Sequence, residues 1–421
     1  MSNQRLFAKP LILDAEEAHK NGVIVYDNDN SASLKLSSGK VVVIPPDKQF
    51  DLTQATIFGL NERLTMAATS PVIDKDGQTL REKFNTEWEK YSEKLSEIEG
   101  NRLDYGFYAY YEERNDLVRF CPPFWHHVVS VASSSKLLAD PKNSLTWAEI
   151  RNVFENTTIA VAGCSVGSSV INAAVMDLRP KNLKIADKSV YKMENINRVR
   201  LAYYEMVKNQ AQRSSAVDMS LKNKAKVVAD QLYSIDPFLN VYVYDEGINA
   251  SNIESFLGEG EGGPKTSVVV EEVDDPRIKI FIREEARKKG LPVLMVTDIG
   301  SSVQLDVLRY DKDKNLPLSW GVSDDVLKEK MEKVYEQAGN KKVFFEFVDA
   351  LIGKDYRAGE LNEIIEERVE IPTSTIIPQL GSTVAMAGAI AAESIARIVL
   401  GFDLPSRVII NKQTFEVKVY R

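Results

Sequence analysis

Residues 158–187 read TIAVAGCSVGSSVINAAVMDLRPKNLKIAD, and this stretch decides the fold. The short, largely apolar run 158–162 is typical of a buried parallel strand. A turn with Gly163 and Gly167 follows, and we expect a helix over 168–178 and a second strand over 183–187. A strand, a tight turn, a helix and another strand make a βαβ unit, which predicts a parallel sheet.

The same alternation continues towards the C-terminus. It predicts helices and strands over 224–235, 241–244, 267–270, 277–289, 292–297 and 303–310. An Ala-rich helix is expected over 381–400, closed by Gly401 as a C-cap, and a hairpin over 408–410 and 415–420. Together these elements predict an α/β fold, a Rossmann-like, mostly parallel sheet with helices on both faces.

The N-terminal quarter differs in pattern from the rest of the chain. Short apolar clusters at 23–26 and 41–44 alternate with turn-rich segments, which indicates short strands, and a charged helix is expected over 80–98. We therefore expect a smaller α+β domain over 1–105, which would be an accessory or substrate-recognition domain. The main domain would cover 106–421 and contain a charged insertion over 311–375, irregular apart from a helix near 326–337.

Composition excludes several classes of protein. The net charge of −8 disfavours nucleic acid as the main partner. No apolar run is long enough to span a bilayer, and the stretch 384–392 indicates a buried helix. The N-terminus lacks the basic-then-apolar order of a secretory signal. With two cysteines, Cys121 and Cys164, a disulfide framework is not expected and the cytoplasm is the predicted location.

The turn between the first strand and its helix is a candidate anion site. Glycines at 163 and 167 let the backbone approach a phosphate, Ser165 lies between them, and the start of a helix favours negative charge. Asp187 ends the next strand, where a carboxylate can accept hydrogen bonds from a ribose. This turn is one glycine short of the G-x-G-x-x-G pattern, so a purely structural turn is an equal alternative on this signal alone.

Four further segments give this turn a context. They are DKSVYKMENINR at 187–198, KAK at 224–226 on a helix that ends with IDP at 235–237, VVVEEVDD at 268–275, and IPQLG at 377–381 before the Ala-rich helix. Their order resembles the ThiF/MoeB and ubiquitin-activating-enzyme superfamily. There, Asn-Leu-x-Arg follows the second strand, a Lys-bearing helix closes on Ile-Asn-Pro, and a later strand ends in Asp-x-x-Asp-Asn.

The resemblance implies a site for ATP and Mg²⁺. Arg198 and Lys224 would neutralise the phosphates, Asn195 would hydrogen-bond phosphate or ribose, and Asp187 would bind the ribose. Asp274 would hold Mg²⁺, which prefers one or two carboxylates together with phosphates and water. Attack of a carboxylate on the α-phosphate depends on positioning and on such charge neutralisation.

Several assignments leave alternatives open. Arg198 and Lys224 could be solvated surface charges, and Lys222 or Lys226 could take the place of Lys224. The segment Asp274-Asp275-Pro276 could be a helix N-cap followed by proline at the first helical position.

Arg114 begins a short Arg-Asn element that resembles one found upstream of the first strand in the family. The resemblance implies that this arginine reaches ATP bound to the other protomer of a homodimer. Arg119 is a competing candidate, and a surface arginine is as well supported as a functional one.

Sulfur chemistry separates the chain from many members of the superfamily. No cysteine follows Cys164, and the paired C-x-x-C zinc motifs are missing. The sequence therefore predicts ATP- and Mg²⁺-dependent adenylation of a carboxylate on a small protein or peptide, with pyrophosphate release and transfer to a non-cysteine or external acceptor. The alternatives are a non-catalytic partner subunit, an enzyme that activates a carboxylate on transfer RNA, and, last, a nicotinamide-dependent oxidoreductase.

Overall fold

The computed structural model describes residues 5–53, 106–120, 147–206, 221–260, 262–353 and 379–421. The chain forms two compact units. The large unit consists of residues Met1–Phe7, Val153–Ile235 and Leu239–Arg421, and the small unit of Ala8–Asn152 and Asp236–Phe238. The sequence placed a boundary at residue 105, whereas the units divide near residue 152, because two strands just after residue 105 pair with N-terminal strands.

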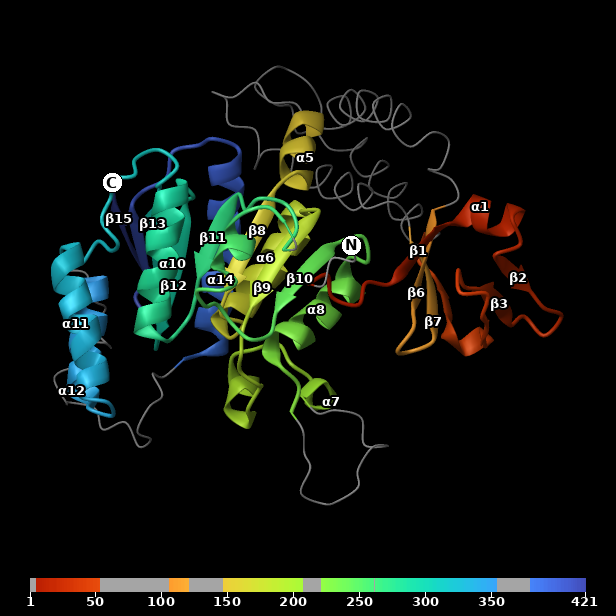
Figure 1. Ribbon diagram of the computed structural model, residues 1–421, viewed down its shortest axis with the longest axis horizontal. Helices are drawn as coiled ribbons and strands as arrows, with labels where there is room; N and C mark the ends of the chain where they lie inside the picture. The colour runs from red at the N-terminus through yellow and green to blue at the C-terminus, as the bar shows by residue number, and fades with distance from the viewer. Residues whose placement is uncertain (1–4, 54–105, 121–146, 207–220, 261, 354–378) are drawn as a thin grey trace. The chain divides into compact units, whose positions relative to one another are not determined.

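The large unit is built on an eight-stranded sheet (Figure 1). Its order is β10 (Asn240–Tyr244), β9 (Asn182–Ala186), β8 (Thr158–Ala162), β11 (Val268–Glu271), β12 (Val293–Ile299), β13 (Ser302–Leu308), β14 (Arg407–Asn411), β15 (Glu416–Tyr420). The first five strands are parallel, and the last three are antiparallel to their neighbours. The expected α/β fold with a mostly parallel sheet is confirmed.

Helices cover the parallel strands on both faces, which explains why most residues of these strands are apolar. Every residue of β8, β9 and β11 is buried. On one side α6 (Val166–Leu178) packs against α8 (Lys224–Ile235) and a C-terminal helix. On the other side α9 (Ile253–Leu257) and α10 (Pro276–Lys289) contribute to a core with alternate residues of the strands, including Ala160 and Ala162.

The C-terminal helix α14 (Gly381–Val399) lies in the core of the large unit. Among the described residues, this helix alone is long and apolar enough to cross a membrane, and 56% of the window that passes this test is buried. It packs along α6, and Gly388 allows the two backbones to approach closely, because a Cβ there would lie 2.5 Å from Ser169 Oγ. The expectation that no apolar run is long enough to span a bilayer is therefore wrong by length and composition, whereas the prediction of a buried helix is confirmed.

One helix of the expected insertion was missed. The expected helix near 326–337 is α11 (Asp324–Glu336), but a second helix, α12 (Lys341–Ile352), follows where irregular chain was predicted. Its N-cap Asn340 accepts hydrogen bonds from the amides of Lys342 and Val343, and Phe347 lies in the core that it shares with α11. The expectation of irregular chain is wrong for these residues, because tertiary burial of one apolar face stabilises a helix despite flanking charges.

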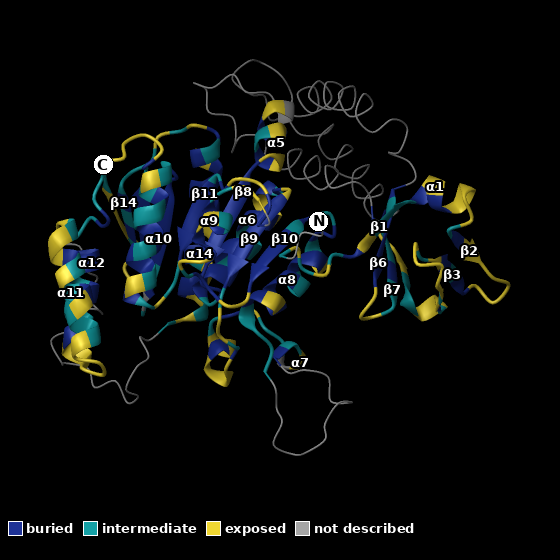
Figure 2. Ribbon diagram, viewed as in Figure 1, coloured by how far each residue is buried: buried dark blue, intermediate teal, exposed yellow. Residues whose placement is uncertain are grey.

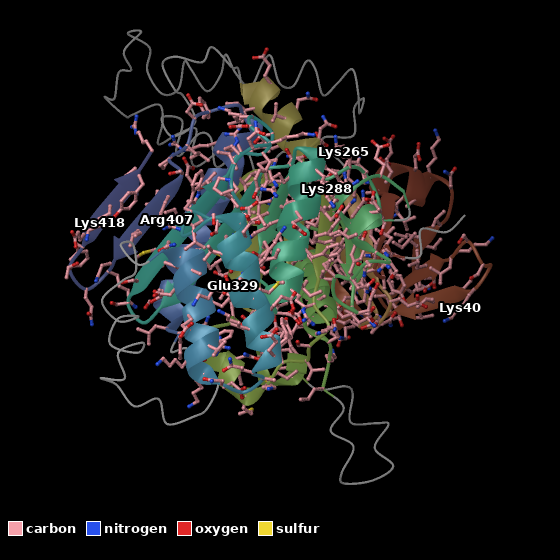
Figure 3. The ribbon with its side chains drawn as sticks, turned by 60° about the vertical axis from the view of Figure 1, so that its left-hand side comes forward. Lys40, Lys265, Lys288, Glu329, Arg407 and Lys418 are labelled. Carbon is pink, nitrogen blue, oxygen red and sulfur yellow. The ribbon has the colours of Figure 1, made fainter. Side chains whose placement is uncertain are left out.

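The closing hairpin extends the sheet beyond the helices. Arg407 at the start of β14 is buried and donates hydrogen bonds to the Asp306 carboxylate and to the Ile352 carbonyl (Figure 3). The last strand, β15, is exposed at four of its five residues (Figure 2). The hairpin was predicted and is confirmed.

The small unit is formed mainly by short strands. One sheet has the order β1 (Leu11–Asp14), β6 (Phe107–Tyr111), β7 (Asp116–Phe120), β5 (Gln49–Asp51), and the other has β2 (Ile24–Tyr26), β3 (Ala32–Lys35), β4 (Val41–Ile44). The unit also includes α1 (Ala15–Lys20) and the short 3-10 turn Pro46–Lys48, and α5 (Trp147–Glu155) begins within it. The helix expected over 80–98 lies outside the described residues.

Candidate functional site

The parallel strands bring the predicted site residues to one edge of the sheet. Ala162 pairs with Ala186 of β9 and with Glu271 of β11, so the residues that follow these three strands leave the sheet at one level. Ligands of open α/β sheets bind at this carboxyl edge. The glycine turn, Asp187 and Asp274 therefore share one edge, as the sequence predicted.

The glycine turn is fixed by the packing around it. Gly163 has a φ of 98°, and a Cβ there would lie 2.6 Å from the carbonyl carbon of Glu272. Its amide donates to the Ala186 carbonyl at 2.8 Å. Gly167 is also confined, since a Cβ would meet Val161 Cγ1 at 3.0 Å. Packing alone thus requires glycine at position 163, whatever binds there.

Ser165 gives the turn a feature that packing does not explain. It is the residue before α6, yet its side chain makes no capping hydrogen bond, and its Oγ is buried without a hydrogen-bond partner. The first amides of a helix also lack partners within the helix. A buried hydroxyl beside such amides fits a phosphate group.

Asp187 ties the turn to the next loop. Its Oδ2 accepts the Cys164 amide and its Oδ1 accepts the Ser189 amide, each at 2.8 Å. The carboxylate is half-buried, so each oxygen keeps lone pairs that a hydroxyl could use. Ribose binding stays a prediction for this residue.

The predicted Asn-x-x-Arg element forms the 3-10 turn η2 (Met193–Asn197) and the residue after it. Asn195 is buried, and its Oδ1 accepts the Lys192 amide at 2.9 Å, which closes the turn. Arg198 is half-buried and donates from Nη1 to the Glu194 carbonyl at 3.2 Å, while its Nε is buried without a partner. Asn195 thus stabilises the turn, and Arg198 has one donor, Nε, that makes no hydrogen bond.

Lys224 has its ammonium near a residue that is bonded to the turn. It begins α8, and its Nζ lies 5.6 Å from the centre of the Tyr191 ring, whose hydroxyl donates to the Cys164 carbonyl at 2.9 Å. Its charge lowers the pKa of Cys164, whereas burial raises that pKa well above its ordinary value. Lys226 instead forms an ion pair with Asp245 at 2.5 Å.

The two adjacent aspartates after β11 have different surroundings. Asp275 is the N-cap of α10 and accepts the amides of Arg277 and Ile278, with Pro276 at the first helical position. Asp274 is exposed and makes no side-chain hydrogen bond or ion pair within the described parts of the chain. The capping alternative therefore applies to Asp275 and leaves Asp274 free for a ligand.

Glu271 and Glu272 end the same strand and are held by the protein itself. Glu271 is fully buried and pairs with Lys279 at 2.8 Å and with Arg283 at 2.9 Å. Glu272 accepts the Val296 amide at 2.7 Å, and burial, together with the charge of Asp298, raises the pKa of its carboxyl. These contacts make Glu271 a structural residue.

The sequence missed Asp298. It lies near the end of β12, is 3% exposed, and accepts a hydrogen bond from Gln379 Nε2 at 3.0 Å through Oδ1, while Oδ2 is buried without a partner. Burial raises its pKa to about 7, the Arg198 charge opposes that shift, and the Asp274 charge adds to it. An acidic residue after a predicted parallel strand identified Asp187, and the same signal could have found Asp298.

Arg114 lies in the small unit, in the turn between β6 and β7. It is exposed, forms an ion pair with Asp116 at 3.1 Å and stacks over the Tyr111 ring at 4.5 Å. Its competitor Arg119 pairs with Asp51 at 3.4 Å. Contact of either arginine with a nucleotide stays a prediction.

Within the described residues, no group of three or more His, Cys, Asp or Glu side chains could hold a metal ion by themselves. Mg²⁺ on a nucleotide needs only one or two protein carboxylates, because phosphates and water complete its ligands. Asp274 is exposed at this edge, and Asp298 Oδ2 is buried without a hydrogen-bond partner. The donor chemistry of the site thus fits a nucleotide with a divalent cation.

Several solved structures are similar to the chain at low sequence identity. The chain is similar to PaaA (13% identity, TM-score 0.46, covering 84% of this chain and 99% of that one). It is also similar to E. coli MccB bound to MccA-N7isoASN (12%, TM-score 0.45, covering 94% and 96%). Another similar structure is E. coli MccB with ATP (14%, TM-score 0.41, covering 71% and 70%).

Among curated proteins, an uncharacterized protein of Mycobacterium tuberculosis, MT1398, is 28% identical over 192 residues, which are 46% of this chain. The match spans only 24% of that relative. The model of the ThiF family matches residues 146–419, which include the whole glycine turn, η2, the Lys224 helix, Asp274 and Asp298. The resemblance found in the sequence is thereby confirmed, and the chain belongs to the ThiF family.

Proposed function

We propose that the chain adenylates a carboxylate with ATP. A carboxylate oxygen attacks the α-phosphorus, the bond from that phosphorus to the bridging oxygen breaks, and pyrophosphate leaves with the electron pair. The main support is one observation within the family assignment: the glycine turn, Asp187 and Asp274 follow neighbouring parallel strands at one edge of the sheet. Lys224 lies over the Tyr191 ring, whose hydroxyl donates to the turn.

Each part of the nucleotide has a matching group. The turn from Gly163 to Gly167 and the start of α6 would hold phosphate oxygens, with the Ser165 hydroxyl as an additional donor. Asp187 would bind the ribose. Bound at Asp274, Mg²⁺ would neutralise charge on the phosphates.

The cations of the site would act on developing charge. Arg198 can turn its unused Nε towards a phosphate oxygen, and Lys224 can approach from the other side of the turn. Asn195 would support Arg198 by fixing η2, and its remaining amide group would hydrogen-bond the nucleotide. These roles require no protein nucleophile, since positioning and electrostatics dominate phosphoryl chemistry.

The substrate would be a carboxylate on a small protein or peptide, recognised with help from the small unit. Cys164 is unsuited to receive the activated acyl group, because its thiol is fully buried and burial raises its pKa. We therefore assign transfer to a non-cysteine or external acceptor. A homodimer in the cytoplasm, with Arg114 acting on the partner's nucleotide, completes the proposal.

Pyrophosphate exchange tests this function. The full chain is incubated with ATP, Mg²⁺, labelled pyrophosphate and candidate peptides that end in a free carboxylate. Wild-type protein should exchange label with the correct peptide, and Arg198→Ala or Asp274→Ala should reduce exchange by about 100-fold or more, as loss of one transition-state contact does elsewhere. Lys224→Ala should also reduce exchange. Its matched control is Lys226→Ala, because Lys226 is paired with Asp245.

The outcomes separate the main alternatives. Failure of the wild-type chain to bind ATP would exclude adenylation. Binding of ATP without exchange for any peptide or modified transfer RNA would favour a non-catalytic partner subunit. Full activity in both Arg198→Ala and Asp274→Ala would show that the site is placed wrongly.

A further inference from the structure

Asp298 is a buried acid that the proposed adenylation site does not yet use. It is 3% exposed, and one of its carboxyl oxygens, Oδ2, contacts no hydrogen-bond donor. A buried carboxylate is costly unless it is paired with a cation or binds a metal. A residue with this property at the carboxyl edge of the sheet calls for a ligand.

Asp298 and Asp274 lie at the carboxyl ends of neighbouring parallel strands. β11 pairs with β12 in a parallel ladder, Asp298 lies near the end of β12, and Asp274 follows the end of β11. Both carboxylates therefore lie at the edge of the sheet where ligands of open α/β folds bind. Two carboxylates at the ends of adjacent parallel strands are a donor set that Mg²⁺ accepts.

The hydrogen bond from Gln379 orients Asp298 for such a role. Gln379 occupies Oδ1 at 3.0 Å and leaves Oδ2 directed elsewhere. Metal-binding carboxylates are commonly held in this way by a neighbouring donor. The segment that contains Gln379 is also fixed, because Gly300 bridges to Gln379 and the Thr383 hydroxyl donates to the Gly300 carbonyl at 2.7 Å.

The charges around Asp298 favour a cation. Asp274, at the end of the neighbouring strand, is also acidic. Arg198 does not form an ion pair with Asp298 in the described residues, so the charge at Oδ2 is left without direct neutralisation. A divalent ion between Asp298 and Asp274 would supply it.

We propose that Asp298 Oδ2 and the Asp274 carboxylate together bind the divalent cation of the nucleotide site. Asp298 then differs from Glu271, whose charge is neutralised by Lys279 and Arg283. The inference rests on the proposed function for the identity of the nucleotide, but it concerns a contact that the family assignment does not supply.

Mn²⁺ replaces Mg²⁺ in the test because its binding can be followed by electron paramagnetic resonance. The full chain is titrated with Mn²⁺ alone and with Mn²⁺ plus a non-hydrolysable ATP analogue. Asp298→Asn should weaken Mn²⁺ binding about tenfold or more, and Gln379→Leu should weaken it by a smaller factor. Asp403→Asn is the control, because this carboxylate is 96% exposed and paired only with Lys312.

A second measurement guards against misfolding. Mn²⁺ should raise the melting temperature of the wild-type chain and of Asp403→Asn, and should leave that of Asp298→Asn almost unchanged. If Asp298→Asn does not fold, the decrease in Gln379→Leu decides the question.

Three results would overturn the inference: Mn²⁺ affinity of Asp298→Asn equal to that of wild type, an unchanged affinity in Gln379→Leu when Asp298→Asn is unfolded, or no Mn²⁺ binding by wild type under either condition. Nucleotide binding to the metal-free wild-type chain is measured separately. Its absence would count against the proposed function, whereas its presence together with unaltered Mn²⁺ affinity in the variants would count against Asp298 alone.

Discussion

At the residue scale, the site separates groups that hold the fold from groups that remain available. Protein groups already form ion pairs or hydrogen bonds with the side-chain oxygens of Glu271, Asp275 and Asn195. Ser165 Oγ, Arg198 Nε and Asp298 Oδ2 are buried and have none. The sequence could place most of these residues at strand ends but could not assign their hydrogen bonds, because burial and partner geometry depend on tertiary packing.

Gly163 tests how strictly the turn requires glycine. Gly163→Ala should lower the free energy of unfolding by about 2 kcal/mol or more, because a left-handed backbone costs about 1–2 kcal/mol and a Cβ would also overlap the Glu272 carbonyl. Gly401→Ala is the matched control, since Gly401 has a φ of 82° but nothing within 4 Å of a Cβ. Urea unfolding compares them, and equal losses would show that the Glu272 contact is unimportant.

Asp298 makes stability depend on pH in metal-free protein. Burial raises its pKa from 3.8 to about 7, so the folded chain binds the proton more tightly than the unfolded chain. The protonated Asp298 carboxyl therefore adds its full share to the free energy of unfolding below about pH 4. This share is lost as the pH rises through about 7.

Asp298→Asn should accordingly become more stable relative to wild type between pH 4 and pH 8, by about 2–4 kcal/mol. Denaturant unfolding in EDTA at both pH values measures the difference. A constant difference between the two proteins would contradict the raised pKa.

At the element scale, the periodic segments were predictable almost to the residue. β8 and α8 have the predicted bounds, because their apolar patterns end at clear breaks. Helix α12 was missed although Gly339 and Asn340 precede it, since its charged first turn hid the apolar face formed by Phe347, Leu351 and their neighbours. The position of Asp298 after a strand was predictable, but its hydrogen bond with Gln379 was not, because the two residues lie 81 positions apart in the sequence.

The contact between α14 and α6 gives a prediction at this scale. On helix propensity alone, Gly388→Ala should stabilise the chain by about 1 kcal/mol. We expect the opposite, a loss of about 1–3 kcal/mol, because the added Cβ would lie 2.5 Å from Ser169 Oγ and 2.7 Å from its carbonyl oxygen. Exposed Ala389→Gly calibrates propensity in the same helix, and thermal unfolding of both variants gives the sign.

At the scale of the whole molecule, the small unit is enclosed within the sequence of the large one. The residues before Ala8 belong to the large unit. There the Phe7 amide donates to the Val241 carbonyl, and Arg5 pairs with Glu246 at 2.8 Å. The chain thus enters the large unit, forms the small unit and comes back. Arg114 belongs to the small unit, so its proposed action on the partner's nucleotide would require the small unit of one protomer and the large unit of the other.

Mixing of variants tests that cooperation. Arg114→Ala and Arg198→Ala should each lose pyrophosphate exchange when assayed alone. If Arg114 acts on the nucleotide of its partner, co-refolded or subunit-exchanged mixtures contain heterodimers with one intact site and should regain about a quarter of wild-type activity. No recovery, with heterodimers shown by native mass spectrometry, would place Arg114 outside the partner's site.

The buried thiol of Cys164 has a consequence for measuring motion. An alkylating reagent can reach it only when the turn from Gly163 to Gly167 separates from Tyr191 and Ala186, so its labelling rate in a Cys121→Ser background reports the free energy of local opening. A nucleotide seated on the turn would slow labelling in proportion to its occupancy. The labelling rate of Cys164, a residue unsuited to catalysis, thereby measures how readily the site opens.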